Sequence, residues 1–197
     1  MIDRVQELLF RSEFFLKSYE RLERLYQDNI PSDAIEAYKY NTSDVVTLLK
    51  INAILYYYET VSCIASLLKE ENIKNPLKNE ISFGILRNYV DTLRKDEYIK
   101  DIEHIYNYYN KSGLKDIRNK IVDHKDLKTS GNPVTSFINF VNPRYVEPCH
   151  NIIKELKTIL EKYIPNEQLW NDYYSGYYSK AIDKFFRMIK SEIGNIK

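Results

Sequence analysis

Glycine and proline are scarce in this sequence, which has five glycines and six prolines among its 197 residues. All-β sandwiches and barrels need many turns rich in these two residues, so both architectures are disfavoured. Apolar residues make up 44% and charged residues 29% of the chain, a balance that argues against a disordered protein. Leu, Ile, Lys and Glu run through most segments and favour long helices, so we expect an all-α fold.

Cysteine and histidine are also few. Cys63 and Cys149 lie far apart and match no spacing of zinc ligands, so neither a disulfide framework nor a structural zinc site is predicted. Glu147 and His150 have the Glu-x-x-His spacing of di-iron helical bundles, but that fold needs two such pairs. A capping role at a helix start explains Glu147 more simply, and His104 is expected to be an ordinary, partly buried residue. We expect no metal and no other cofactor.

No segment is apolar enough to predict a membrane span. The most apolar region, 45–68, is interrupted by Lys50, Asn52 and Glu59 and falls short of the roughly 20 apolar residues that a span requires. The first seven residues carry charges where a signal peptide needs an apolar core. With so few cysteines, a reducing compartment fits best. We therefore expect a cytoplasmic protein with no membrane contact, in which 45–68 is a buried helix.

A strong charge of one sign and the usual enzyme signatures are missing as well. The formal net charge is +1, which excludes a nucleic-acid binder of the strongly basic kind. No glycine-rich phosphate loop, nucleophile elbow or His-Glu-x-x-His motif occurs, so the commonest nucleotidases, hydrolases and zinc proteases lack support. Any site for RNA or DNA would have to be local.

Apolar residues recur at three- and four-residue steps, between helix breakers, along almost the whole chain. The pattern predicts one domain over 1–197, a helical bundle of about six to seven helices with one long loop at about 126–142. Gly113 is predicted to end a helix in the left-handed conformation. Because 44–71 is apolar nearly all round, we expect it at the centre of the bundle. The predicted helices span about 1–30, 44–71, 81–93, 97–110, 114–123, 143–163 and 170–193, with a short helical piece at 31–40.

The segment from Arg118 to His124 contains the strongest candidate for chemistry. Cleaving RNA without a metal needs a group that accepts the 2′-hydroxyl proton and a cation that stabilises charge on the phosphate oxygens. Imidazole, whose ordinary pKa is near neutrality, suits the first task. A guanidinium that binds two oxygens at once suits the second. Asn119 can orient either group by hydrogen bonding.

Arg118-Asn119-x4-His124 resembles the signature of the HEPN superfamily of helical proteins. That signature is an Arg, usually followed by Asn, Asp or His, and then a His four to six residues after the Arg. The wider stretch from Ile117 to Asp126 resembles the abortive-infection AbiU-type branch of HEPN-like proteins, with Asp123 where that branch more often has a small residue. The resemblance implies a metal-independent endoribonuclease of a prokaryotic phage-defence or toxin–antitoxin system.

The same resemblance implies site residues and partners. Arg118 would clamp the phosphate, Asn119 would orient the reacting groups, and His124 would act as the general acid and base. RNA would be the substrate, two copies of the motif would meet in a homodimer, and a toxin of this type would have a cognate antitoxin protein. The residues expected to help bind substrate are Lys120, Lys125 and Asp126.

Helix geometry and local charge bear on this hypothesis. Six residues along a regular helix rotate by about 600°, which leaves Arg118 and His124 roughly 120° apart in projection. Either His124 lies beyond the helix end, or a second subunit brings a complementary motif close. From 111 to 128 there are six basic residues and three acidic ones, a local balance of +3 against +1 for the whole chain. That balance predicts a modest phosphate-attracting patch.

Two other interpretations remain open. Arg, Asn, Asp and His at a helix end are also ordinary surface and capping residues. A non-catalytic helical module would use Arg118, Asn119 and His124 to hold a dimer or to bind a nucleotide, RNA or a partner protein. A purely structural bundle would leave Arg118 and His124 apart and exposed.

Overall fold

A computed structural model of the chain describes residues 1–28, 44–70, 73, 81–119 and 145–164, and a few positions between 180 and 191. These residues form six α-helices, one 3₁₀ helix and no strand, which confirms the predicted all-α class. The predicted piece at 31–40, the loop at 126–142 and most of the predicted helix at 170–193 lie outside them. The elements are α1 (Ile2–Asp28), α3 (Asp44–Leu67), α5 (Phe83–Leu86), η1 (Thr92–Arg94), α6 (Lys95–Lys111), α7 (Leu114–Arg118) and α9 (Val146–Tyr163).

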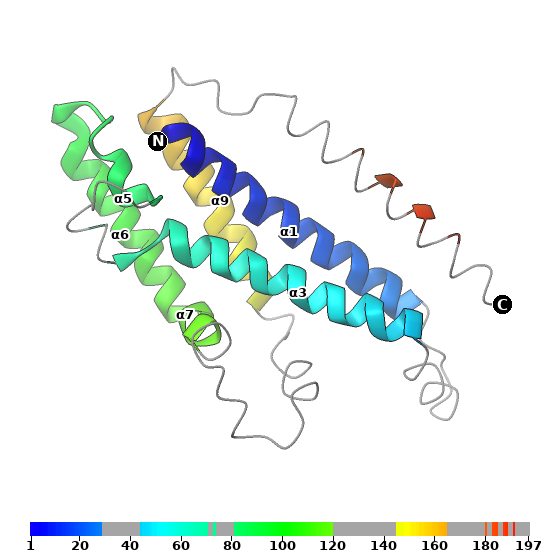
Figure 1. Cartoon of the computed structure of the whole chain (residues 1–197). Helices are drawn as coiled ribbons and strands as arrows, with labels where there is room; N and C mark the ends of the chain where they lie inside the picture. The colour runs from blue at the N-terminus through cyan, green and yellow to red at the C-terminus, as the bar shows by residue number, and fades with distance from the viewer. Residues whose placement is uncertain are drawn as a thin grey trace.

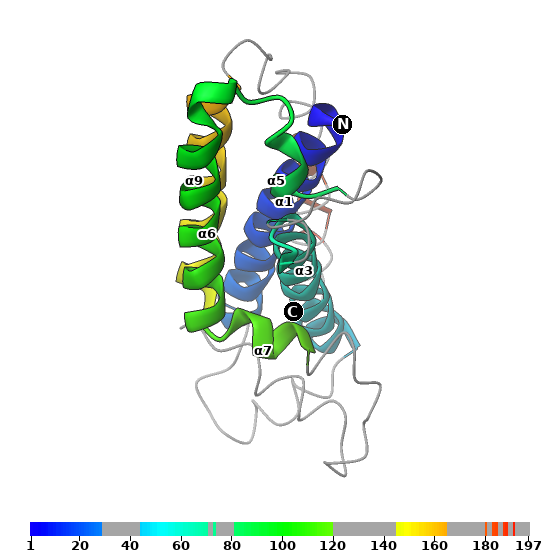
Figure 2. The ribbon, with the colours of Figure 1, turned by 90° about the vertical axis from the view of Figure 1, so that its left-hand side faces the viewer.

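Two pairs of long helices form the body of the bundle. α1 and α3 lie side by side (Figure 1), and α6 and α9 form the second pair (Figure 2). α9 also contacts α1 and α3, while the short α7 runs from the end of α6 toward α3. The predicted central place of α3 is confirmed on the side that meets α1, α7 and α9. It is wrong for the opposite side, where Ile51 and Leu55 are 40% and 52% exposed.

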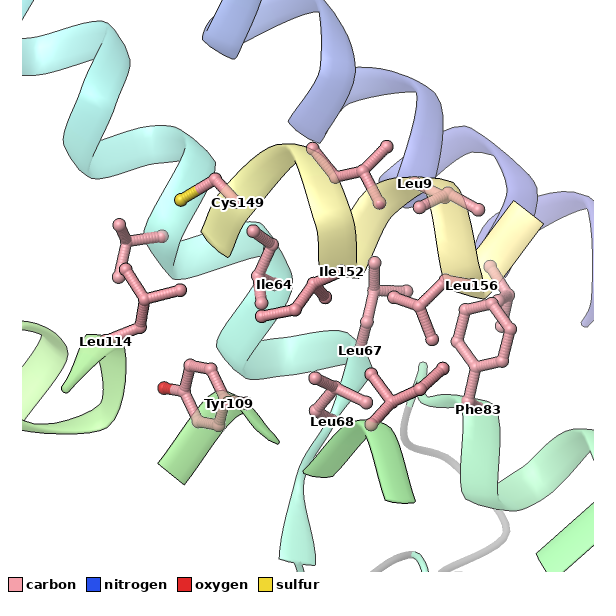
Figure 3. Packing of buried hydrophobic residues seen from close by; sticks show 14 of the residues in the cluster. Leu9, Ile64, Leu67, Leu68, Phe83, Tyr109, Leu114, Cys149, Ile152 and Leu156 are labelled. Atoms are coloured by element: carbon pink, nitrogen blue, oxygen red, sulfur yellow. The ribbon is translucent and has the colours of Figure 1, made fainter. Parts of the chain in front are cut away.

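One apolar cluster joins the described helices. Side chains of α1, α3, α5, α6, α7 and α9 meet in it (Figure 3), because each helix places apolar residues three and four positions apart on one face. The apolar face predicted for 143–163 is confirmed, since its six apolar residues at helical spacing are all buried: Ile152, Ile153, Leu156, Ile159, Leu160 and Tyr163. The labelled members of the cluster are Leu9, Ile64, Leu67, Leu68, Phe83, Tyr109, Leu114, Cys149, Ile152 and Leu156.

The predicted helix at 81–93 is wrong. Only Phe83–Leu86 is α-helical there, and the chain then turns before η1. Asp91 has the extended backbone angles φ −50° and ψ 136°, and its side chain accepts a hydrogen bond from the backbone N–H of Leu93 at 2.8 Å. Such a cap starts a new element, and it competes with a continuous helix. Leu93, the last residue of the predicted helix, is 93% exposed.

Glu13 ties α1 to α9. Its carboxylate lies 2.9 Å from Lys17 Nζ of the same helix and 2.5 Å from Lys157 Nζ of α9. Burial by itself would raise the pKa of Glu13, but the two lysines outweigh it and hold the pKa below its ordinary value of 4.5. A carboxyl group with a lowered pKa stabilises the fold above its unfolded pKa, and this contribution is lost as the pH falls through the folded value.

Replacing Glu13 with Gln is therefore expected to lower the free energy of unfolding by about 0.5–1 kcal/mol at neutral pH. The difference between variant and wild type should shrink toward zero as the pH falls well below 4.5, because the wild-type carboxylate is then protonated too. The difference in the free energy of unfolding is measured by urea denaturation, followed by circular dichroism, at a series of pH values. A difference that stays constant over that range would contradict the assigned role of the charge.

Candidate functional site

A left-handed glycine sets the direction of α7. Gly113 has φ 80°, directly after α6, so the prediction of a helix-ending glycine is confirmed. Leu114 and Ile117 are 0% and 4% exposed and anchor α7 in the apolar cluster. Residues three and four apart on a helix share a side. Lys115 and the pair Arg118 and Asn119 accordingly lie together along α7.

The conformation of Gly113 leads to a prediction. A Cβ at this position would lie 3.2 Å from Tyr145 Cε1, and a left-handed backbone costs a residue with a Cβ roughly 1–2 kcal/mol. Gly113→Ala should lower the free energy of unfolding by about that amount, measured by urea denaturation. Gly113→Asn is the matched comparison, because Asn tolerates this backbone region better. Equal losses in both variants would show that the contact with Tyr145, not the backbone angle, decides the cost.

A pocket of about 630 Å³ opens beside α7. Its cationic and polar wall comes from α7, from α6 and from the residues that follow α3. Its apolar wall comes from α1, α3 and Ile81. A volume of this size falls in the range of about 300–1,000 Å³ that is typical of small-molecule sites. The lining residues are Leu8, Ala65, Ser66, Leu68, Lys69, Glu70, Ile81, Tyr106, Tyr109, Lys115, Arg118 and Asn119.

Arg118 and Asn119, the first two residues of the motif, both line this pocket. Both side chains are half-buried, and Arg118 Nη1 donates a hydrogen bond to Asn119 Oδ1 at 3.3 Å. Burial raises the pKa of Tyr109 above its ordinary value, and the nearby guanidinium of Arg118 opposes part of this rise. The guanidinium thus lies between a polar amide and a neutral aromatic wall, an arrangement that suits an anion entering from the pocket.

A second polar group lies on the same side of the pocket. Lys115 Nζ donates to the hydroxyl of Tyr106 at 3.0 Å, and that hydroxyl donates to Glu70 Oε2 at 2.5 Å. The same carboxylate oxygen is 3.4 Å from Lys115 Nζ. The hydrogen bond with Tyr106, together with the charge of Glu70, raises the pKa of Lys115 above its ordinary value. Lys115 is therefore a permanent cation at neutral pH.

The other predicted site residues lie beyond the described part of the chain. Asn119 is the last residue described before the gap, so Lys120, His124, Lys125 and Asp126 are all outside it. The predicted helix at 114–123 is confirmed from Leu114 to Arg118, with Asn119 still in the helical region at φ −65° and ψ −41°. The predicted angle of roughly 120° between Arg118 and His124 around the helix axis therefore stays a prediction.

Sequence reasoning missed three pocket residues: Lys69, Glu70 and Tyr106. Lys115 was counted only as part of a basic patch. Lys69 and Glu70 lie in the segment that follows α3, whereas Tyr106 lies on α6 and Lys115 on α7, beyond the turn at Gly113. Periodicity within one helix cannot bring them together, so the sequence offered no signal for this cluster.

The two described histidines and the two cysteines do not line this pocket. His150 Nε2 forms a hydrogen bond with Glu20 Oε1 of α1 at 2.7 Å, and Glu147, for which a capping role was expected, lies in the first turn of α9. The prediction that His104 is partly buried is wrong, since it is exposed on α6. Cys63 and Cys149 are buried and unpaired, and burial raises the pKa of these thiols to about 11 and about 12. Among the described residues no cluster of three His, Cys, Asp or Glu side chains could hold a metal ion.

No helix in the described ranges combines the length and apolar character needed to cross a membrane.

Comparison with known proteins gives no independent guide to the site. A scan against models of known protein families, a search of curated proteins and a search of solved structures each find no match.

Proposed function

We propose that this protein is an HEPN-like, metal-independent endoribonuclease of a prokaryotic phage-defence or toxin–antitoxin system. One observation supports the proposal above the others: Arg118 and Asn119 of the Arg-Asn-x4-His motif line a pocket in which Lys69 and Lys115 add two further cations. Cations and hydrogen-bond donors that converge on one cavity are what a phosphodiester needs, both for binding and for stabilising charge in the transition state.

The chemistry assigns one task to each motif residue. His124 would take the proton from the 2′-hydroxyl, and the resulting oxygen would attack the adjacent phosphorus. Arg118 would hold two of the phosphate oxygens as negative charge builds up on them, with Asn119 fixing the guanidinium through the observed hydrogen bond. The bond from phosphorus to the 5′-oxygen then breaks, and a proton from water or from the partner subunit's His124 reaches that oxygen. The products are a 2′,3′-cyclic phosphate and a 5′-hydroxyl.

This proposal includes the remaining expectations from the sequence. Lys120, Lys125 and Asp126 would contact the RNA on either side of the cleaved bond. The protein would act in the cytoplasm as a homodimer, with an antitoxin protein as its regulator, and without a metal or other cofactor. The dimer would bring the Arg118 of one subunit close to the partner subunit's His124, which is one of the two arrangements that the projected angle between these residues allows.

The test is incubation of the purified protein with total cellular RNA in excess EDTA, followed by analysis of the fragment ends. Wild type should cleave in the chelator and leave 2′,3′-cyclic phosphate ends, whereas His124→Ala should not cleave while keeping its oligomeric state. Cleavage by His124→Ala at the wild-type rate would contradict the proposal. RNA binding without any cleavage by wild type would instead assign the non-catalytic binding module.

A further inference from the structure

The contacts around Glu70 identify a second anion-binding position in the pocket. Two donors from different helices, the hydroxyl of Tyr106 and the ammonium of Lys115, converge on one oxygen of this carboxylate. A phosphate oxygen accepts hydrogen bonds from the same donors as a carboxylate oxygen does. The carboxylate of Glu70 therefore has the place and the partners that a phosphate group would have.

The ion pair between Glu70 and Lys115 can break at low cost. Its side chain is 55% exposed and that of Lys115 is 41% exposed. Ion pairs with this exposure contribute little to stability, because water solvates both charges when they separate. An incoming phosphate, with more charge and more acceptor oxygens than one carboxylate, can compete for Tyr106 and Lys115 while Glu70 turns toward solvent.

The position adjoins the motif. Lys115 and Arg118 are three residues apart on α7, and such residues are neighbours with about 5–6 Å between their Cβ atoms. Both line the same pocket, with Asn119 beside them. An anion at Lys115 would thus be adjacent to the phosphate expected at Arg118, within one continuous cavity.

The apolar wall of the pocket indicates what the anion is attached to. Leu8, Ala65, Leu68 and Ile81 give that wall an apolar surface, and the ring of Tyr109 extends it. An inorganic anion would leave this surface uncovered, whereas a ligand that joins a phosphate to a flat, weakly polar ring system would cover it. A nucleotide has this composition, and the cavity is large enough for one.

We propose that Tyr106 and Lys115 form a subsite for the phosphate of a nucleotide, and that Glu70 occupies this subsite in the free protein. The inference rests on the proposed function only in that the nucleotide would belong to an RNA chain next to the cleaved bond. The same chemistry also fits a free nucleotide. Glu70 then acts as an internal competitor that sets the affinity of the pocket for phosphate.

Isothermal titration calorimetry with adenosine 5′-monophosphate and with adenosine tests the subsite. Glu70→Gln should tighten binding of the monophosphate roughly three- to tenfold, because it removes the competing charge but keeps the shape. Tyr106→Phe and Lys115→Gln should weaken binding by a similar factor. Adenosine should respond to none of the three substitutions. Asp96→Asn, an exposed carboxylate of α6 away from the pocket, is the matched control and should leave both titrations unchanged.

A short oligoribonucleotide with a 2′-O-methyl group at each position, which cannot be cleaved by 2′-hydroxyl attack, distinguishes the two sources. Tighter binding of this strand but not of the monophosphate in Glu70→Gln would assign the subsite to a nucleotide within a chain. An affinity for both ligands that is unchanged or weakened by Glu70→Gln would overturn the subsite. The titrations repeated in a His124→Ala background separate this outcome from failure of the proposed function, because binding at Lys115 does not require the histidine.

Discussion

Replacing Arg118 with alanine is expected to lower the rate of RNA cleavage roughly 100- to 1,000-fold, the range found when one preorganised donor to a developing negative charge is removed. The guanidinium lies in the pocket wall, held by Asn119, so its position is set before substrate arrives. Arg118→Lys keeps the charge but loses the planar fork that binds two oxygens, and it should fall between alanine and wild type. Initial rates with a fluorescent RNA in EDTA measure all three proteins.

Arg24→Ala provides the control for this comparison. Arg24 is an exposed arginine of α1 and is not part of the pocket lining, so its replacement removes the same charge from the molecule without touching the site. Its cleavage rate should equal that of wild type. A similar loss in both variants would indicate that net charge, acting through general attraction of RNA, matters more than the guanidinium in the pocket. Unchanged thermal unfolding of both variants excludes a loss of the fold.

The largest expected effect on stability comes from Leu67→Ala. Leu67 is 0% exposed at the end of α3 and belongs to the apolar cluster that α3 shares with α9 (Figure 3). Truncation of such a leucine removes buried methyl groups and leaves a cavity, and it costs about 2–5 kcal/mol. Urea denaturation should show the midpoint falling while the dependence on urea concentration stays the same.

Leu55→Ala is the matched control, because it makes the same chemical change on the same helix at a side chain that is 52% exposed. Its free energy of unfolding should stay within about 0.5 kcal/mol of wild type. A loss comparable with that of Leu67→Ala, and larger at high protein concentration than at low, would show that the outer side of α3 is covered in an oligomer. The expected result contradicts such coverage and leaves Leu55 in solvent.

Much of the fold could be predicted from local patterns. The buried faces of α1 and α9 follow from apolar residues three and four positions apart. This spacing identifies the buried face of a helix even when the neighbouring helices are not known. The left-handed conformation of Gly113 could also be predicted locally, because a residue without a Cβ adopts this conformation at no steric cost. The helix predicted at 81–93 does not form as one element, because the cap at Asp91 starts a new element and Leu93 is exposed.

Some features of the candidate site could likewise be predicted from the sequence, and others could not. The sequence alone determined the all-α class, the place of the neighbouring residues Arg118 and Asn119 in a helix predicted at about 114–123, and the chemical suitability of these residue types for phosphate. Only the tertiary structure decided that Lys69, Glu70 and Tyr106 join them around one cavity and that Glu70 faces Tyr106 and Lys115. The physical reason is that helical periodicity relates residues within one helix, whereas a pocket depends on how α3, α6 and α7 pack, and that packing is set by contacts between residues far apart in the chain.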